Sequence, residues 1–400
     1  MRKFGPFEAA IRQQWDAFDA QARTGLELDA VALDLHPLED ALFASGGMAD
    51  GGWDVAFVAT DWIAAMREQK CAVDLKPLLD GEPPEDYPDG WSESLLRLQR
   101  IDGAVLGVPY HDGPECLIYR RDLFEDPALC RRFQNEYDHP LAPPTTWTEF
   151  HEVARFMQTA VEGLYGTVFA AYPDGHNSVY DFLLQVWTRG GELAGADGEL
   201  KFSTPQAHEA LSFYREILND THAVHPECRS LDSVAAGARF AAGEVAMMVN
   251  WFGFAAHAHT AEESAVRGLV NIAEVPAVAP QFRASLNVYW ILSIASGSAH
   301  RDLAWQFLRH CQTAAMDKLT TTSGAIGCRK STWADPDVNA AIPFYRRLET
   351  LHASAREIPQ RADWPRIAAI IDALVTATIS TETPISELLA HADEAYSDFK

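Results

Sequence analysis

Short apolar segments that alternate with amphipathic helices are the feature that most constrains the fold of this chain. Residues 54–59 (DVAFVA) are expected to form a short buried strand, and a helix is expected from Ile63 onward. The same order returns at residues 165–171 and 179–187, where a strand precedes an amphipathic helix. Because strands and helices alternate along the chain, the pattern predicts an α/β fold.

The length of the chain, 400 residues, is too great for one compact core. Single hydrophobic cores stop growing near ~250–300 residues, so two domains are expected. Hydrophobic residues make up 48% and charged residues 22% of the sequence, which is typical of a globular rather than a disordered chain. The formal net charge of −25 argues against nucleic acid or an anionic membrane as a partner.

Cysteine and histidine usage argues against a metal or redox centre. The 6 cysteines are too far apart for a C-x-x-C motif, and we expect free, mostly buried thiols. His257 and His259, followed by Glu262 and Glu263, offer metal ligands, but such a group on an acidic segment is usually structural. There is no P-loop, G-x-G-x-x-G, G-x-S-x-G or H-E-x-x-H motif. The sequence therefore predicts no cofactor and no metal.

A series of short stretches carries a resemblance to a known family. They are residues 54–61 (DVAFVATD), 107–110 (GVPY) with Glu115 and 117–119 (LIY), 147–150 (WTEF), 240–247 (FAAGEVAM), 324–327 (GAIG) and 358–360 (IPQ). Each pattern alone is loose. Their common order and spacing resemble the family 1 extracellular solute-binding proteins of ABC importers, whose best-known members bind maltose and related sugars. The resemblance covers nearly the whole chain from Phe7 onward.

The resemblance implies a type II periplasmic-binding-protein fold, with two doubly wound α/β lobes joined by crossover segments. Lobe 1 would hold residues 1–112 and 278–325, and lobe 2 would hold residues 113–277 and 326–400. A carbohydrate or polyol would bind in the cleft between the lobes, and hinge closure would deliver it to the transmembrane subunits of an ABC permease. The resemblance also implies a monomer, no enzymatic activity and a periplasmic or cell-envelope location.

The start of the sequence departs from this family pattern. The family opens with a strand, whereas here a helix with Phe7, Ile11 and Phe18 on one apolar stripe is expected from about residue 6. Residues 26–35 alternate and are expected to form a strand, which would leave an empty position in the sheet beside it. No apolar signal-peptide segment follows Met1, so a cytoplasmic location stays open. We expect the natural start to lie upstream.

The carboxyl ends of strands supply the first candidate site residues, because ligands of open α/β sheets bind there. Asp61 and Trp62 follow one predicted strand, and Asn250 and Trp251 end another. Carboxylates and amides hydrogen-bond sugar hydroxyls, and a Trp or Tyr ring stacks on the C–H face of a sugar. The alternatives are a helix N-cap for Asp61 and a core position for Trp62.

The first predicted crossover supplies His111, Asp112 and Glu115. By resemblance, Glu115 corresponds to a sugar-binding glutamate. His111 and Asp112 are expected to contact the ligand or, alternatively, to pair with each other in the hinge.

A polar turn before an aromatic helix offers Asp174, His176 and Asn177, for which ordinary turn chemistry is the alternative. By resemblance, Tyr180 occupies the position of a stacking aromatic residue. Arg189 follows the same helix and is a candidate to face the cleft, although the glycines beside it also suit a helix C-cap.

The last candidates lie late in the chain. Asn287 and Tyr289 share one face of a predicted strand at residues 286–295 and Trp290 lies on the other; one of these faces belongs to the core. By resemblance, Trp364 lies near a late aromatic platform.

Other functions stay open at this point. Asp61 and Glu115 could form a glycosidase carboxylate pair. The chain could instead be a cytosolic interaction protein that binds no small molecule. Within the receptor interpretation, the polar and aromatic candidates favour a neutral sugar or polyol. A polyamine stays open as the ligand, because Asp61, Asp112, Glu115 and Asp174 could form an acidic cage.

Overall fold

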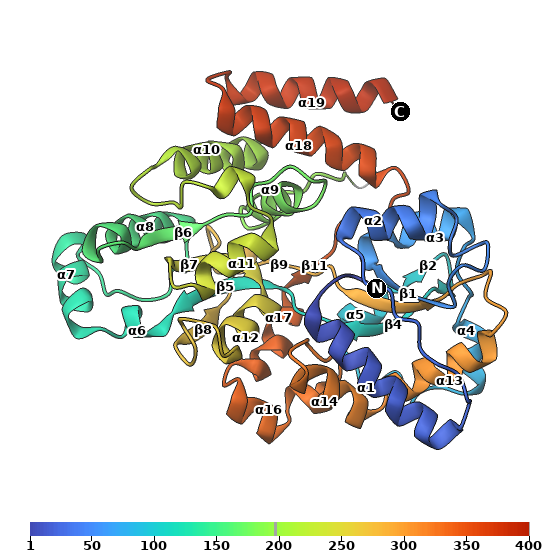
Figure 1. Cartoon of the computed structure of the whole chain (residues 1–400). Coiled ribbons are helices and arrows are strands. Elements are labelled where there is room, and N and C mark those ends of the chain that lie inside the picture. The colour runs from blue at the N-terminus through green and yellow to red at the C-terminus, as the bar shows by residue number, and fades with distance from the viewer. Residues whose placement is uncertain (196–197, 400) are drawn as a thin grey trace. The chain divides into compact units, whose positions relative to one another are not determined.

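The chain divides into two compact units, each with its own sheet and core (Figure 1). The computed structural model describes residues 1–195 and 198–399. Unit 1 comprises Met1–Pro114, Asn287–Ala353 and Gln360–Ala362. Unit 2 comprises Glu115–Leu286, Ser354–Pro359 and Asp363–Lys400.

These boundaries differ from the predicted lobes chiefly at residues 326–353, which belong to unit 1. Asp317, on a helix of unit 1, accepts hydrogen bonds from the backbone N–H groups of Cys328 (2.8 Å) and Arg329 (3.1 Å). It also accepts one from the Thr332 hydroxyl (2.5 Å). These bonds tie the segment to the helix before it, so the Gly-rich stretch predicted as the last crossover is a turn inside unit 1.

The sheet of unit 1 has three strands in the order β1 (Val55–Ala59), β10 (Trp290–Ile294) and β4 (Val108–His111). β10 is antiparallel to both neighbours, so β1 and β4 run in the same direction. The last residue of β1, the first of β10 and the last of β4 are aligned in the register. The carboxyl ends of β1 and β4 therefore share one edge of the sheet with the amino end of β10.

Two sequence predictions about these strands need correction. The strand predicted at residues 54–59, whose continuous apolar run is typical of a parallel sheet, is confirmed, but its strand partner in the described chain is antiparallel. The predicted first crossover begins only after His111, because Pro109, Tyr110 and His111 belong to β4. A proline is tolerated there because a missing N–H costs least at the edge of a sheet, and β4 is an edge strand.

The helix α1 (Gly5–Ala22) covers the core of unit 1, as its apolar stripe predicts. Phe7, Ile11 and Phe18 are buried, and the Phe7 ring lies 5.3 Å from that of Phe57 on β1. α1 also packs against α13 and α14. The helix ends at Ala22, because Arg23 adopts a left-handed conformation (φ 52°) and caps it.

The prediction of a strand at residues 26–35 is wrong. Within the described part of the chain, only Leu33 pairs there, in a parallel bridge with Arg2. Lys3 N–H donates to the Leu33 carbonyl (2.6 Å), and Leu33 N–H donates to the Met1 carbonyl (2.9 Å). Alternating apolar and acidic residues form a strand only where a second strand pairs with them. Here the pairing segment is only a few residues long, at the start of the chain.

The remaining elements of unit 1 surround this sheet. They are α2 (Leu35–Glu39), the π-helical turn Asp40–Ala44, the 3-10 turn Thr60–Trp62, α3 (Ile63–Gln69), α4 (Lys76–Gly81), α5 (Glu93–Leu98), the hairpin β2 (Arg100–Ile101) and β3 (Ala104–Val105), α13 (Arg301–Cys311), α14 (Ala314–Thr322), α15 (Lys330–Trp333), α16 (Pro336–Ala341), the 3-10 turn Tyr345–Arg347 and α17 (Leu348–Ala353).

The sheet of unit 2 has four strands in the order β6 (Tyr165–Val168), β7 (Val245–Trp251), β5 (Glu115–Arg120) and β8 (Val270–Ala273). β6 is parallel to β7, whereas β5 is antiparallel to both β7 and β8. The first residue of β5 is aligned with the last residue of β7. Strand β8 was not predicted, and its burial alternates along its length.

Helices pack against the sheet of unit 2. α8 (Trp147–Ala160) begins with a capping box, in which Thr146 and Glu149 satisfy each other's backbone N–H groups. The other elements are α6 (Arg121–Phe124), α7 (Pro127–Tyr137), α9 (Asn177–Trp187), α10 (Pro205–Asn219), the 3-10 turn Cys228–Ser230, α11 (Ser233–Ala241), α12 (Phe252–Thr260), the 3-10 turn Pro280–Phe282, the parallel pair β9 (Ser285–Leu286) and β11 (Ala355–Arg356), α18 (Trp364–Ser380) and α19 (Ile385–Phe399).

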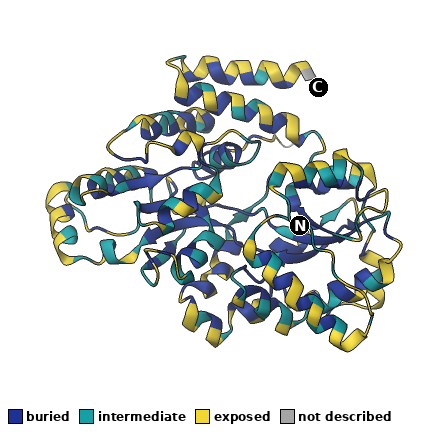
Figure 2. Cartoon of the chain, in the orientation of Figure 1, coloured by how far each residue is buried: buried dark blue, intermediate teal, exposed yellow. Residues whose placement is uncertain are grey.

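Burial follows this layering. The strands are mostly buried and the outward faces of helices such as α10 and α18 are exposed (Figure 2).

The six cysteines are free thiols and mostly buried, as predicted; only Cys130 is partly exposed. In residues 1–195 and 198–399, no helix has both the length and the apolar character needed to cross a membrane.

Candidate functional site

The edge of the unit 1 sheet brings several predicted site residues together. Asp61 lies in the 3-10 turn that follows β1, and Asp112 follows β4 directly. Asn287 lies a short step before β10. Because the ends of these strands are aligned, the three polar side chains belong to the same edge, where α/β sheets bind ligands.

Asp112 and Asn287 are buried polar residues with unused hydrogen-bonding capacity. Each is only 1% exposed. The Asp112 Oδ2 atom lies 2.6 Å from His352 Nε2, but its Oδ1 atom has no hydrogen-bond partner among the described residues. The Oδ1 and Nδ2 atoms of Asn287 also have no hydrogen-bond partner among the described residues. A ligand with hydroxyl groups would supply the missing donors and acceptors.

His111 has a structural role within unit 1. Its Nδ1 atom accepts a hydrogen bond from the Ile326 backbone N–H (2.9 Å), and its ring lies 4.7 Å from Phe7. Burial lowers the pKa of His111 to about 4, so the imidazole is neutral near pH 7. The predicted alternative, a pair between His111 and Asp112, is not found among the hydrogen bonds of the described residues: His111 Nδ1 bonds to Ile326, and Asp112 Oδ2 bonds to His352.

The depressed pKa of His111 predicts a loss of stability on acidification. The unfolded chain takes up a proton near pH 6.5 and the folded chain only near pH 4, so this stability is lost as the pH falls between those values. Between about pH 7.5 and about pH 5 the expected loss is about 2 kcal/mol. Urea unfolding of the wild type and of His111→Gln at both pH values measures it. Equal pH dependence in the two proteins would contradict the assignment.

Trp62 and Tyr289 pack inside unit 1. Trp62 is 4% exposed, and its ring lies edge-on to Trp290 (5.8 Å). The Tyr289 hydroxyl donates to the Leu95 carbonyl, and its backbone N–H donates to the Thr60 hydroxyl. The core alternative is therefore favoured for both residues.

The edge of the unit 2 sheet holds a carboxylic acid beside two aromatic rings. Glu115 begins β5 and is paired with Trp251 at the end of β7. The Tyr180 ring, in the first turn of α9, lies edge-on to Trp251 at 5.8 Å. Trp251 is half-buried, whereas Glu115 is 6% exposed. This grouping offers a hydrogen-bonding group and a ring face at one place.

Burial favours the neutral form of the Glu115 carboxyl. Burial raises the pKa of Glu115 well above its usual range, and the charge of Asp181 raises it further. Its Oε2 atom has no hydrogen-bond partner in the described part of the chain. A protonated carboxyl both donates and accepts hydrogen bonds, which suits a hydroxyl group.

Asp181 is a residue of this site that the sequence interpretation missed. It follows Tyr180 on α9, and its Oδ2 atom accepts a hydrogen bond from the buried Tyr214 hydroxyl (2.6 Å). Burial raises the pKa of Asp181 to about 7. The signal available in the sequence was its place next to a predicted aromatic contact.

The polar turn before α9 is largely occupied by its own hydrogen bonds. The Asp174 carboxylate accepts from the backbone N–H of His176 (3.0 Å), from the backbone N–H of Asn177 (2.9 Å) and from the Asn177 side-chain amide (2.5 Å). The Asn177 side-chain oxygen accepts from Ser233 N–H (2.9 Å), and the Asn250 amide donates to the Ser233 carbonyl (3.0 Å). Asn177 and Asn250 therefore anchor the start of α11, and Asp174 is bound within its own turn. The His176 ring lies against Tyr180 at 5.7 Å.

Arg189 lies beyond the opposite end of α9 from Tyr180. Its guanidinium donates to the Gln185 carbonyl (2.8 Å) and side-chain oxygen (2.6 Å) and lies 5.3 Å from the Phe213 ring. Burial lowers the pKa of Arg189 to about 10. It lines a cavity of about 470 Å³ with Thr146, Trp147, Thr148, Glu209, Ser212, Phe213, Glu216 and Val278, none of them a predicted site residue.

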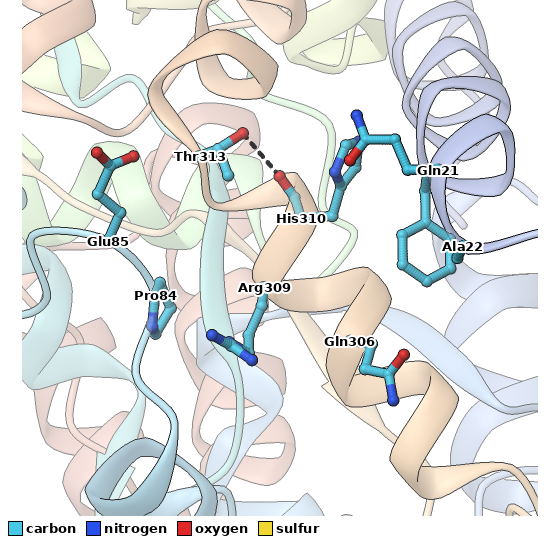
Figure 3. Close-up of a pocket in the computed structure, with 9 residues that line it drawn as sticks. Gln21, Ala22, Pro84, Glu85, Gln306, Arg309, His310 and Thr313 are labelled. Atoms are coloured by element: carbon cyan, nitrogen blue, oxygen red, sulfur yellow. Dashed lines mark hydrogen bonds between the residues drawn. The ribbon is translucent and has the colours of Figure 1, made fainter.

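Trp364 is the first residue of α18 and is buried, and its indole N–H has no partner within the described ranges. The second cavity, of about 430 Å³, lies on unit 1 between α1, α13 and the segment at 84–85 (Figure 3). Arg309 there is already paired with Glu82 (2.7 Å). This cavity shares no residue with the predicted site. The described residues contain no group of metal-ligating side chains.

Two α/β units, each with polar and aromatic side chains at one edge of its sheet, define a ligand-binding protein. Residues 9–318 match the model of the bacterial extracellular solute-binding protein family, and the chain belongs to this family.

Solved structures support the same fold. The maltose-bound MalE3 of T. maritima is 22% identical, with a TM-score of 0.86 over 100% of this chain and 98% of that chain. A solute-binding protein from Agrobacterium radiobacter K84 in complex with ribitol is 20% identical, with a TM-score of 0.83 over 98% of this chain and 96% of that chain. The predicted type II periplasmic-binding-protein fold is confirmed.

A curated relative agrees with this family. A putative binding protein of Brucella abortus (strain 2308) is 24% identical over 369 residues, which cover 92% of this chain and 83% of the relative.

Proposed function

We propose that this chain is the substrate-binding receptor of an ABC importer and that it binds a neutral carbohydrate or polyol. A set of buried polar side chains at the two sheet edges carries the proposal. Asp112, Glu115 and Asn287 are 1%, 6% and 1% exposed, yet each has a side-chain oxygen without a hydrogen-bond partner among the described residues. Buried polar atoms of this kind are rare unless a ligand or water satisfies them.

The chemistry of these side chains fits hydroxyl groups. A sugar hydroxyl both donates and accepts, and so do the Asn287 amide and a protonated Glu115. The half-buried Trp251 ring, against which the buried Tyr180 ring lies edge-on, provides the apolar surface on which the C–H face of a sugar packs. A ligand with alternating hydroxyls and C–H groups meets both requirements.

A cationic ligand such as a polyamine fits these residues less well. The acidic cage that would hold it needs ionised carboxylates. The Asp174 carboxylate already accepts three hydrogen bonds from its own turn, and burial raises the pKa of Glu115, which favours its neutral form. Only Asp61 and Asp112 of the four carboxyl groups then remain to offset the desolvation of a polyvalent cation.

Family relatives support the ligand class and the remaining steps of the proposal. The structures described above carry maltose and ribitol, and another, from Agrobacterium vitis S4, carries D-mannitol. By the same relationship, we place this chain outside the cytoplasm as a non-enzymatic monomer. Ligand binding then closes the two units by a hinge motion and the closed form docks on a permease. A ligand-dependent fall in the radius of gyration, measured by X-ray scattering, tests the closure step.

Thermal unfolding against a panel tests the receptor proposal. The panel is maltose, ribitol, D-mannitol, D-tagatose and, as a cation, spermidine. A ligand at about one hundred times its dissociation constant adds about 2.7 kcal/mol to the folded state, which raises Tm by roughly 3 °C for a chain of this length. We expect such a shift with at least one sugar or polyol and recovery of the bound compound unchanged by mass spectrometry. A shift with spermidine alone would contradict the ligand class, and hydrolysis would contradict the receptor.

The neutral state of Glu115 makes a specific prediction about its variants. Glu115→Gln keeps the size and both hydrogen-bonding functions of a protonated carboxyl, so we expect affinity for the bound sugar within about threefold of wild type. Glu115→Ala removes both functions and is expected to weaken binding about tenfold or more. Calorimetric titration of the three proteins checks this. Equally large losses of affinity in Glu115→Gln and Glu115→Ala would show that binding needs an ionised carboxylate.

A further inference from the structure

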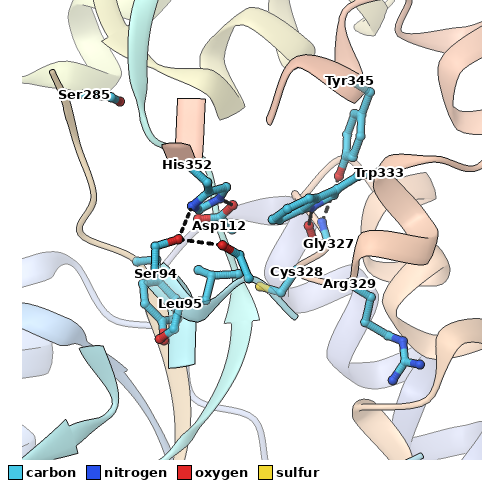
Figure 4. Close-up of polar contacts among 12 residues, drawn as sticks. Ser94, Leu95, Asp112, Ser285, Gly327, Cys328, Arg329, Trp333, Tyr345 and His352 are labelled. Carbon is cyan, nitrogen blue, oxygen red and sulfur yellow. Dashed lines mark hydrogen bonds and ion pairs between the residues drawn. The ribbon is translucent and has the colours of Figure 1, made fainter. Parts of the chain in front are cut away.

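A buried chain of hydrogen bonds in unit 1 ends on Asp112. Ser94 on α5 lies 2.9 Å from His352 Nδ1, and His352 Nε2 lies 2.6 Å from Asp112 Oδ2 (Figure 4). All three residues are buried, with 9%, 7% and 1% exposure. His352 comes from α17, 240 residues beyond Asp112, so nothing in the local sequence indicates the contact.

The chain of bonds fixes the tautomer of the imidazole. A carboxylate only accepts hydrogen bonds, so the His352 Nε2 atom carries the proton donated to Asp112. In the neutral ring the Nδ1 atom then accepts the Ser94 hydroxyl proton. The Ser94 oxygen also lies 2.8 Å from that of Ser92, which can donate to it in turn.

Packing also holds the His352 imidazole ring in place. The Trp333 ring is stacked on the His352 ring with centroids 4.8 Å apart and an interplanar angle of 9°. The Trp333 indole N–H in turn donates to the Gly327 carbonyl (2.9 Å). The imidazole can therefore neither tilt nor rotate without breaking one of these contacts.

We propose that His352 is a positioning residue of the ligand site, which holds one oxygen of Asp112 so that the other is presented to a ligand hydroxyl. The inference rests on the proposed function and extends it. Asp112 Oδ2 is held by His352, whereas Oδ1 is buried without a partner among the described residues. The Asp112 backbone is also fixed, since its N–H donates to the Ile326 carbonyl (3.1 Å). A carboxylate fixed at two points loses little freedom on binding, which favours affinity.

Variants at His352 separate positioning from simple packing. His352→Gln places an amide N–H donor near the Nε2 position and keeps the bond to Asp112. His352→Asn reaches only the Nδ1 position and keeps a contact to Ser94 alone, and His352→Leu keeps neither. All three lose the stack on Trp333, so a packing role would affect them alike.

The affinity for the tightest-bound member of the sugar and polyol panel is measured by calorimetry. We expect a loss of roughly tenfold to hundredfold in the Leu and Asn variants and recovery to within about threefold of wild type in the Gln variant. The matched control is His151→Leu in unit 2, which breaks a histidine–aspartate contact of similar length (2.7 Å to Asp220) and should leave affinity unchanged. Thermal unfolding confirms that each variant is folded.

The outcomes distinguish this inference from the proposed function. If the wild type binds a panel member and the folded Leu variant binds it equally well, His352 does not position Asp112. The same follows if the Gln variant is as weak as the Asn variant, a comparison that stands even if the Leu variant fails to fold. If the wild type binds no member of the panel, the proposed function fails and this inference fails with it.

Discussion

Replacement of Trp251 by alanine is expected to weaken binding of the preferred sugar or polyol by at least about 30-fold. Trp251 ends β7 beside Glu115 and lies edge-on to Tyr180 at 5.8 Å, so its ring is fixed before the ligand arrives. Fixed aromatic residues at the centre of a site contribute about 2 kcal/mol or more to binding. Calorimetric titration of the wild type and variant measures the loss.

Two control variants define what this result means. Trp251→Phe keeps a ring face and is expected to keep most of the affinity, within about fivefold of wild type. Trp15→Ala removes a partly buried tryptophan that packs on Phe18 and Phe307 in unit 1, and should affect stability but not affinity. A folded Trp251→Ala protein with wild-type affinity would show that the ligand does not pack on the Trp251 ring.

The largest expected effect on stability comes from Asp317→Ala. Asp317 is 6% exposed and accepts three hydrogen bonds, from the backbone of Cys328 and Arg329 and from the Thr332 hydroxyl. Alanine leaves these buried donors unsatisfied at about 1–3 kcal/mol each, so we expect a loss of about 3–5 kcal/mol in the free energy of unfolding. Urea denaturation followed by circular dichroism measures it.

Asp335→Ala is the matched control for this change. Asp335 is the half-buried N-cap of α16 and accepts hydrogen bonds from the backbone of Asp337 and Val338. Because water can replace these bonds, its loss is expected to cost only about 1 kcal/mol. Equal losses in the free energy of unfolding of the two variants would show that burial of the Asp317 hydrogen bonds adds no stability.

The elements that could be predicted from the sequence are those set by local patterns. The apolar stripe of α1 and the short apolar run of β1 both appear where expected, because each leaves a pattern in the local sequence. Residues 26–35 show the limit of this reasoning. A strand needs a partner strand, and the only partner in the described chain is a bridge at Arg2, which no pattern around Leu33 reveals.

The candidate site shows the same division. A strand end selects Trp251, and the predicted crossover supplies Asp112 and Glu115; the structure places all three at sheet edges. Residue type could not tell whether a polar side chain is already occupied, and Asp174 is bound within its own turn. Nor could it reveal His352, whose contact with Asp112 depends on the path of unit 1 between them.

The central claim is that this chain is a receptor whose sugar or polyol binds at the strand ends, and a crystal structure with the tightest-bound panel member tests it most directly. The account predicts a ligand oxygen at hydrogen-bonding distance, about 2.6–3.2 Å, from the Glu115 carboxyl, with the ligand C–H face on the Trp251 ring. A ligand bound instead in the cavity beside Arg189, with Glu115 and Trp251 untouched, would contradict it.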